Sequence, residues 1–320
     1  MNYTNNHNIP LPLAVFLATD HYDYVPNVIS ATTLLKPVKQ IILGNRIAKE
    51  DTLIDIADLV SSRMGTAIHT AIEQAWRNPN KALSSLGFSD KVIERIKINP
   101  EHPDPKDINV YIEKRSSRSI AGMTVSGKFD FVAEGRVQDF KSTSTYTYMN
   151  QTNTDKYRLQ GSIYRWLNPD IITSDTMTIH FIFTDWQKVE SLKNKDYPPN
   201  RVHSQSIDLL SLEATENWLR NKITQIKQYE HADEDDMPAC TDEDLWRKPT
   251  VYKYYKDPNK TERSTKNFTT MSDAAAYMAD RGNVGMIKEV KGQVSACRYC
   301  LAFAICKQKD ALIASGDLII

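Results

Sequence analysis

The spacing of apolar residues over residues 52–76 constrains the fold more than any other feature of the sequence. Apolar side chains recur there every three or four positions, which places them on one face of an amphipathic helix. The apolar positions are Leu53, Ile56, Leu59, Val60, Met64, Ala67, Ile68, Ala71 and Ile72. The segment from Thr52 to about Trp76 is therefore predicted to be one long helix.

Strand-like and helical patterns alternate after this helix. The predicted segments are strands over 109–115, 123–133 and 135–140, a helix over 155–167, a strand over 176–185 and a helix from about Ser211. Gly127 and Gly135 are expected to separate the first three strands. This order predicts a mixed α/β fold in which helices flank one central sheet.

Charge and hydropathy argue against two broad classes of protein. The chain of 320 residues carries 40 basic and 40 acidic side chains, so it has no net charge for nonspecific nucleic-acid binding. A local basic groove or bound metal ions would still allow DNA binding. No stretch approaches the roughly 18 apolar residues that a membrane span needs. The apolar run Ile9–Ala18 is expected to be a core segment, not a signal peptide. We therefore expect a cytoplasmic protein without a membrane partner.

The chain is predicted to divide near an acidic run. Residues 233–236 are all acidic and Pro238 follows, a pattern typical of a solvated linker. All four cysteines lie beyond this run. We therefore predict a core of residues 1–236, around which the first 28 residues wrap, and a small cysteine-bearing module of residues 237–320.

Asp130, Asp139 and Lys141 form a candidate site for phosphodiester hydrolysis. Asp139 and Lys141 are two positions apart, so in a strand they project from the same face. A hairpin would bring Asp130 next to Asp139. Two carboxylates suit Mg²⁺ or Mn²⁺, and a lysine can orient the attacking water or neutralise charge in the transition state. Taken alone, the Asp-x-Lys triplet is explained more readily by a strand with a solvated face.

Two further sets of residues lie at helical spacing around this triplet. Gly65, His69 and Glu73 are each four residues apart and form one stripe on the long helix. His69 is flanked by apolar residues, so we expect it to be at least half buried, as a core residue or as a metal ligand. Gln160 and Tyr164 are also four residues apart and face one way from the later helix.

Taken in order, these motifs resemble the RecB-like branch of the PD-(D/E)XK nuclease superfamily, over about residues 29–185. The matching residues are Gly65-x3-His69-x3-Glu73, Asp130, Asp139-Phe140-Lys141 and Gln160-x3-Tyr164. The implied fold is a PD-(D/E)XK nuclease core, with a central mixed sheet flanked by helices. The segment Ser30–Pro37 also looks like the opening of phage members of this branch.

The resemblance implies a role for each motif residue. His69, Asp130 and Asp139 would bind a metal ion, with the backbone carbonyl of Phe140 completing the coordination, and Lys141 would be the catalytic lysine. Gln160 and Tyr164 would help to hold DNA and the active-site helix. Glu113, on the strand before Asp130, remains open between a metal ligand and an exposed strand residue.

The cysteines indicate a second metal site. Cys297-x2-Cys300-x5-Cys306 is a tight cluster, and Cys240 is the one other cysteine. The resemblance favours a 4Fe–4S cluster, because many RecB-like nucleases end in this spacing with a fourth cysteine elsewhere. Those proteins usually place the fourth cysteine before the core, whereas this chain has none before Cys240. A Zn²⁺ site and a set of reduced, metal-free cysteines therefore remain alternatives.

Residues 250–256, between Cys240 and Cys297, interleave tyrosines with lysines. They could stack on bases and contact phosphates, or form a β-hairpin with ordinary aromatic pairs.

The resemblance implies a metal-dependent DNA nuclease, most typically an exonuclease that acts on DNA ends in recombination, repair or phage DNA metabolism. A structure-specific or restriction-type endonuclease would use the same chemistry. A non-catalytic DNA-binding subunit is a third alternative, and the filled carboxylate and lysine positions argue against it. DNA is the expected partner, together with a recombination or replication protein.

Overall fold

The computed structural model describes residues 2–19, 25, 27–48 and 53–320. The chain forms two compact units. The first comprises Met1–Leu35 and Leu53–Lys227, and the second comprises Lys36–Thr52 and Gln228–Ile320. The predicted boundary between residues 236 and 237 thus lies nine residues after the division between the units, and the second unit also includes residues 36–52. No helix in the described ranges is long and apolar enough to cross a membrane.

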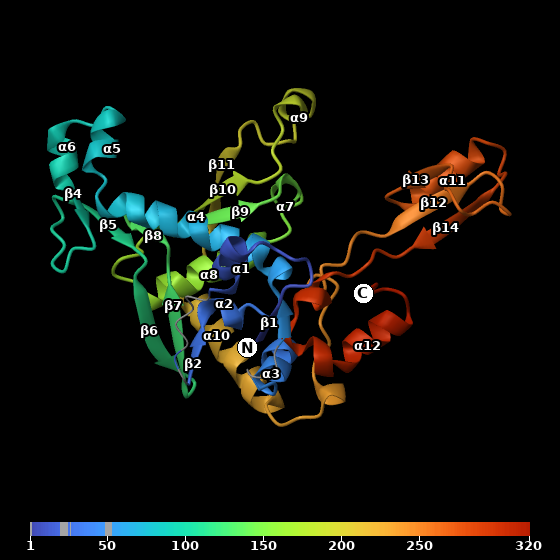
Figure 1. Cartoon of the computed structure of the whole chain (residues 1–320), viewed down its shortest axis with the longest axis horizontal. Coiled ribbons are helices and arrows are strands. Elements are labelled where there is room, and N and C mark those ends of the chain that lie inside the picture. Colours follow the sequence, from blue (N-terminus) through green and yellow to red (C-terminus); the bar gives the residue numbers. More distant parts are fainter. Residues whose placement is uncertain (1, 20–24, 26, 49–52) are drawn as a thin grey trace. The chain divides into compact units, whose positions relative to one another are not determined.

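A six-stranded sheet forms the centre of the first unit (Figure 1). Its strand order is β11-β10-β9-β8-β5-β4. Because β9 pairs in parallel with β10 and antiparallel with β8, the sheet is mixed. Two smaller sheets have the orders β1-β3 and β2-β7-β6. The strands are β1 (Asn2–Thr4), β2 (Val28–Ser30), β3 (Leu53–Asp55), β4 (Ile96–Ile98), β5 (Ile108–Ile112), β6 (Arg115–Ile120), β7 (Met123–Lys128), β8 (Phe131–Ala133), β9 (Arg136–Thr143), β10 (Thr176–Phe183) and β11 (Val202–Asp208).

Helices pack against this sheet, so the predicted mixed α/β fold is confirmed. The helix α4 contacts β9, and α8 contacts β7, β9, β10 and β11. The helices of this unit are α1 (Leu11–Ala18), α2 (Ala31–Leu34), the 3₁₀ helix η2 (Ile56–Leu59), α4 (Val60–Arg77), α5 (Asn80–Ser85), α6 (Asp90–Arg95), α7 (Thr145–Met149), α8 (Thr154–Leu167), α9 (Lys188–Lys193) and α10 (Leu212–Tyr229).

The long helix begins later than its apolar spacing predicts. Residues 53–55 form β3, which pairs in parallel with β1. The Asp55 side chain then accepts a hydrogen bond from the N–H of Ala57 and caps η2, and α4 starts only at Val60. Thr52 lies outside the described residues. The pairing with β1 is a long-range contact, which helical periodicity cannot reveal.

The run at residues 9–18 is not a core segment, so that prediction was wrong. It forms α1, in which Leu17 is the buried residue, while Leu11, Leu13 and Val15 are exposed. The remainder of the predicted N-terminal wrap includes residues 20–24 and 26, which lie outside the described residues.

The strands end where the backbone turns, and only one of the two glycines expected to separate strands lies at such a turn. Glu134 and Gly135 both have positive φ, and they link β8 to β9 as a two-residue hairpin turn between Ala133 and Arg136. Gly127, which was predicted to separate strands, lies inside β7 instead. A Cβ atom there would lie 3.0 Å from the ring of Tyr164, so the glycine lets α8 approach the strand.

The second unit contains a small three-stranded sheet and the four cysteines. The strand order β13-β12-β14 is antiparallel throughout. Tyr254 and Tyr255 are buried, and Tyr254 contacts Tyr277 of α11, so these two tyrosines are packing residues. The elements are α3 (Val38–Asn45), the 3₁₀ helices η3 (Glu234–Asp236), η4 (Ala296–Tyr299) and η5 (Leu301–Ile305), the strands β12 (Val251–Tyr255), β13 (Lys266–Phe268) and β14 (Met286–Val290), and the helices α11 (Met271–Ala279) and α12 (Lys307–Ala314).

The acidic run is not simply a solvated linker, because Glu234 is buried within the second unit. Its carboxylate accepts hydrogen bonds from the N–H groups of Lys307 at 2.9 Å and Gln308 at 3.1 Å, at the start of α12. Lys39 of α3 lies 3.6 Å from the same carboxylate. Burial would raise the pKa of Glu234, but these donors and the lysine outweigh it and lower the pKa. Glu234 therefore ties α3 and α12 together.

We predict that Glu234→Gln lowers the free energy of unfolding by about 1–3 kcal/mol, because charged hydrogen bonds to a helix start are lost. The lowered pKa means that the carboxylate contributes stability above its ordinary value of 4.5. That contribution disappears as the pH falls through the lower folded-state pKa. Urea denaturation at pH 7 and in this acidic range should show the gap between wild type and variant closing. Asp236→Asn, at an exposed position of η3, should change stability little; an equal loss there would contradict the assignment.

Candidate metal centre

The hairpin of β8 and β9 brings the two aspartates together. Phe131 lies opposite Gln138, so Asp130 and Asp139 occupy facing positions just beyond this pair. The N–H of Phe140 donates a hydrogen bond to Asp130 Oδ2 at 3.2 Å. The juxtaposition expected from the sequence is therefore present in the structure.

His69 of α4 bridges the two strands. Its Nδ1 lies 3.2 Å from Asp130 Oδ2, and its Nε2 lies 2.7 Å from the carbonyl oxygen of Phe140. A carbonyl can only accept, so Nε2 carries a proton, and Nδ1 faces a carboxylate. Burial would lower the pKa of His69, but Asp130 outweighs it and raises the pKa. In turn His69 outweighs burial and lowers the pKa of Asp130. The imidazolium form of His69 thus fits its position between the Asp130 carboxylate and the Phe140 carbonyl.

Asp139 and Lys141 form a second charged pair, on the side of β9 that faces α8. Asp139 is 1% exposed, and its carboxylate forms an ion pair with the Lys141 ammonium. Burial raises the pKa of Asp139 to about 6, and Asp130 adds to this effect against the influence of Lys141. Burial would lower the pKa of Lys141, but Asp139 and Asp130 outweigh it, so the lysine keeps its proton. The Lys141 ammonium also lies 5.6 Å from the ring centre of Tyr157.

The donor atoms around His69 fit a hard divalent cation. Ligand atoms of His69, Glu113 and Asp130 lie within 4.8 Å of one another, and no other described group of three such residues does so. The buried Oδ2 of Asp139 accepts no hydrogen bond of ordinary geometry from the described residues, although Lys141 is paired with it. Carboxylate oxygens and an imidazole suit Mg²⁺ or Mn²⁺.

Gln160 and Tyr164 lie inside the protein and not on a helix surface. Both are buried, and Gln160 Nε2 donates a hydrogen bond to the Tyr164 hydroxyl at 2.9 Å. Burial raises the pKa of Tyr164, and the nearby charges of Asp139 and Asp130 raise it further. The pair is therefore buried on α8 beside the carboxylates and has no open face of its own.

Three residues near the two sites are absent from the matching motifs. Glu113 joins His69 and Asp130, and Tyr157 covers Lys141. In the second unit, the Gln308 side chain forms two hydrogen bonds of 2.9 Å with the backbone of Cys240. The position of Tyr157, three residues before Gln160 on α8, is a signal that could have identified it, because residues three apart share a helix face. Glu113 and Gln308 depend on contacts that are distant in sequence.

The four cysteines are free thiols and gather in one part of the second unit. Cys300 and Cys306 pack with a buried cluster around Val38 and Ala302, and Cys240 and Cys297 pack with a cluster around Leu245 and Val294. Burial raises the pKa of all four thiols, that of Cys240 to about 12.

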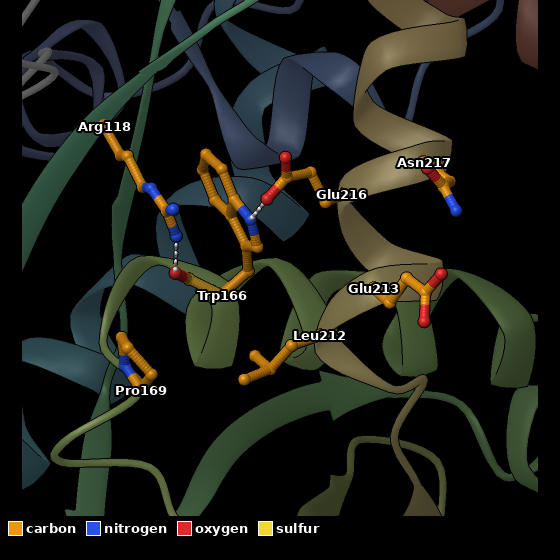
Figure 2. A pocket seen from close by; sticks show the side chains of 7 residues that line it. All are labelled: Arg118, Trp166, Pro169, Leu212, Glu213, Glu216 and Asn217. Atoms are coloured by element: carbon orange, nitrogen blue, oxygen red, sulfur yellow. Dashed lines mark hydrogen bonds between the residues drawn. The ribbon is translucent and has the colours of Figure 1, made fainter.

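A wider pocket of about 360 Å³ lies apart from these residues, between α8, α10 and β6 (Figure 2). Arg118 lies 4.4 Å from the ring centre of Trp166, whose indole N–H donates to Glu216 at 3.2 Å. Glu216 is also paired with Arg220 at 2.6 Å. Trp166 and Arg220 thus both hold the Glu216 carboxylate, and none of the predicted site residues lines this pocket.

Comparisons with known proteins assign no function to this chain, so the site itself is the basis for its proposed function. No family model and no curated protein matches the chain. SSO0001, a solved structure, is 15% identical with a TM-score of 0.38, over 64% of this chain and 78% of that chain. A phage-related exonuclease from Haemophilus somnus 129PT is 14% identical with a TM-score of 0.25, over 38% of this chain and 60% of that chain. This chain thus spans less than two thirds of the exonuclease's length. At these identities and TM-scores, neither similarity assigns a function to this chain.

We predict that Gln160 and Tyr164 are energetically coupled. Tyr164→Phe leaves a buried amide without its acceptor, and Gln160→Leu leaves a buried hydroxyl without its donor, so each should lower the free energy of unfolding by about 1–3 kcal/mol. The double variant should lose less than the two single losses together, because both polar groups are then absent. Urea denaturation of the four proteins measures this coupling. Strictly additive losses would show that the hydrogen bond contributes nothing.

Proposed function

We propose that this protein is a metal-dependent DNA nuclease with a PD-(D/E)XK core. The observation that carries the proposal is the bridge of His69 between Asp130 and the Phe140 carbonyl, directly beside the Asp139–Lys141 pair. Each of these groups has a use in phosphodiester hydrolysis. A structural ion pair needs only one carboxylate and one basic group. This site instead brings together two carboxylates, an imidazole and a lysine.

His69, Asp130, Asp139 and the Phe140 carbonyl would hold the ion. His69 must lose the proton on Nε2 to become a ligand, which also frees the Phe140 oxygen. These two atoms are 2.7 Å apart, close to the roughly 3 Å that separates neighbouring ligands of an octahedral ion with bonds of about 2.1 Å. These two donors would therefore need to separate only slightly to share one ion.

A bound Mg²⁺ or Mn²⁺ would polarise the phosphoryl oxygen and make water a stronger nucleophile near neutral pH. The Lys141 ammonium, kept protonated by Asp139, would orient the attacking water and stabilise negative charge as the phosphorus–oxygen bond forms. Gln160 and Tyr164 would hold α8, and with it Tyr157, in place beside that lysine.

We further propose that the enzyme is an exonuclease that acts on DNA ends in recombination, repair or phage DNA metabolism, in the cytoplasm of a bacterial or phage-infected cell and with a recombination or replication protein as partner. The motif resemblance supports this choice. An endonuclease of the structure-specific or restriction type is the second candidate, because the same residues would serve it.

Digestion of end-labelled linear DNA and closed circular DNA tests this function. We expect the protein to degrade linear DNA with Mg²⁺, to leave circular DNA intact, and to stop in EDTA. Lys141→Ala should lower the rate at least about 10²-fold, because a positioned charge in the transition state is lost. Lys188→Ala removes an exposed lysine of α9 and should leave the rate unchanged.

Each outcome has one meaning. Cutting of circular DNA would replace the exonuclease with the endonuclease. Absence of metal-dependent cutting of either substrate, by protein with a folded circular dichroism spectrum, would refute the nuclease. A folded Lys141→Ala variant with normal activity would refute the role given to the lysine.

We also propose that Cys240, Cys297, Cys300 and Cys306 hold a 4Fe–4S cluster. In a tetrahedral zinc site with Zn–S bonds of about 2.3 Å, the sulfurs lie about 3.8 Å apart. No three of these four sulfurs lie within 4.8 Å of one another. The choice of a 4Fe–4S cluster over zinc rests on the resemblance of the Cys297-x2-Cys300-x5-Cys306 spacing to that of RecB-like nucleases.

Protein purified without oxygen should therefore be brown and contain iron. Visible absorption and metal analysis measure this. Cys306, at the start of α12, is one of the four proposed ligands, so Cys306→Ser should remove most of the iron. Cys240→Ser tests whether the cysteine that is distant in sequence is the fourth ligand. Colourless protein with one zinc would establish the alternative metal, and protein without either metal would leave structural thiols.

A further inference from the structure

Glu113 and Lys128 form an ion pair at the edge of the candidate metal centre. Glu113 follows β5 and Lys128 ends β7. The N–H of Glu113 donates to the carbonyl of Asp130 at 3.0 Å, which fixes its backbone beside that aspartate. The Glu113 side chain is 16% exposed, whereas that of Lys128 is 44% exposed. The carboxylate thus points inward and the ammonium approaches it from the solvent side.

A small cavity of about 10 Å³ lies between these groups. Its polar lining consists of His69, Glu73, Glu113 and Asp130, and its remaining walls are apolar. This volume is about the space that one water molecule requires. The cavity can therefore take one small ion but no larger ligand.

Several carboxylates face the cavity together. A ligand atom of Glu113 lies within 4.8 Å of ligand atoms of His69 and Asp130, and Glu73 lines the same cavity. Glu73 is itself paired with Arg77 on the helix surface. A divalent cation in the cavity would therefore be attracted by Glu113 and Asp130 together.

We propose that Glu113 is a further carboxylate ligand of the active-site cation, and that Lys128 is a resident counter-cation which the ion displaces. This inference rests on the proposed function, because it concerns the same site. Lys128 can leave at little cost, since its side chain is long and 44% exposed. Lys128 then weakens metal binding by competing for the Glu113 carboxylate, whereas Glu113 strengthens it.

Binding of Mn²⁺ to the full chain, measured by calorimetry and electron paramagnetic resonance after removal of metals with EDTA, tests both roles. We expect Glu113→Gln to weaken binding about tenfold or more. Lys128→Met should tighten binding severalfold, because the competing ammonium is gone. The double variant should bind like Glu113→Gln, since Lys128 acts through that carboxylate.

Two variants control for the chemical change alone. Glu134→Gln alters an exposed glutamate with a φ of 51°, close to the 50° of Glu113. Lys114→Met removes a neighbouring charge that lies over the ring of Tyr111. Both should bind Mn²⁺ like the wild type.

The inference is overturned if Glu113→Gln binds Mn²⁺ as tightly as the wild type, or if Lys128→Met binds it no more tightly. If Glu113→Gln fails to fold, Lys128→Met alone decides. Wild-type DNA cleavage is scored separately. If the wild type cleaves DNA and both variants bind Mn²⁺ with wild-type affinity, this inference is refuted and the nuclease stands. If the variants change the Mn²⁺ affinity but the wild type cleaves no DNA, the nuclease is refuted and the metal site stands.

Discussion

The antiparallel pairing of β8 with β9 is the contact on which the candidate site depends. A two-residue turn at Glu134 and Gly135, both with positive φ, sets the register in which Phe131 faces Gln138. A shift by one residue would turn Asp139 and Lys141 to the opposite side of the sheet. The same pairing directs the N–H of Phe140 to Asp130 and leaves its carbonyl for His69. A local turn thus controls the positions of groups on three different elements.

The surroundings of this hairpin explain why two helices are needed. Asp139 and Lys141 face α8, whereas the Phe140 ring between them turns to the other side, stacks on His180 and meets the edge of His69. The helix α4 therefore supplies the imidazole from one side of β9, and α8 supplies Tyr157 from the other. Gly127 permits the close approach of α8, because a side chain there would collide with Tyr164.

The sequence predicted those parts of the site whose residues carry their own local signal. Helical spacing located His69 and the buried Gln160–Tyr164 pair, and strand alternation placed Asp139 and Lys141 on one face. It failed where a contact spans many residues. The start of α4 depends on β3 pairing with β1, and the burial of Glu234 depends on α12, more than seventy residues later. Glu113 is intermediate: the sequence left it open between a metal ligand and an exposed strand residue, and its proximity to His69 arises only once the sheet has formed.

Charge balance links the metal-free site to the proposed metal-bound one. Asp130, Asp139 and Glu113 supply three negative charges, and His69, Lys141 and Lys128 pair with them one by one. A buried charge without compensation is strongly unfavourable, so the site cannot simply gain a divalent ion. If His69 gives up its proton as a ligand and Lys128 withdraws to solvent, two positive charges leave as two arrive. The three carboxylates are balanced in both states, and Lys141 remains in place in each. Under the proposed function, the site would thus exchange its own cations for a metal ion while its charge stays balanced.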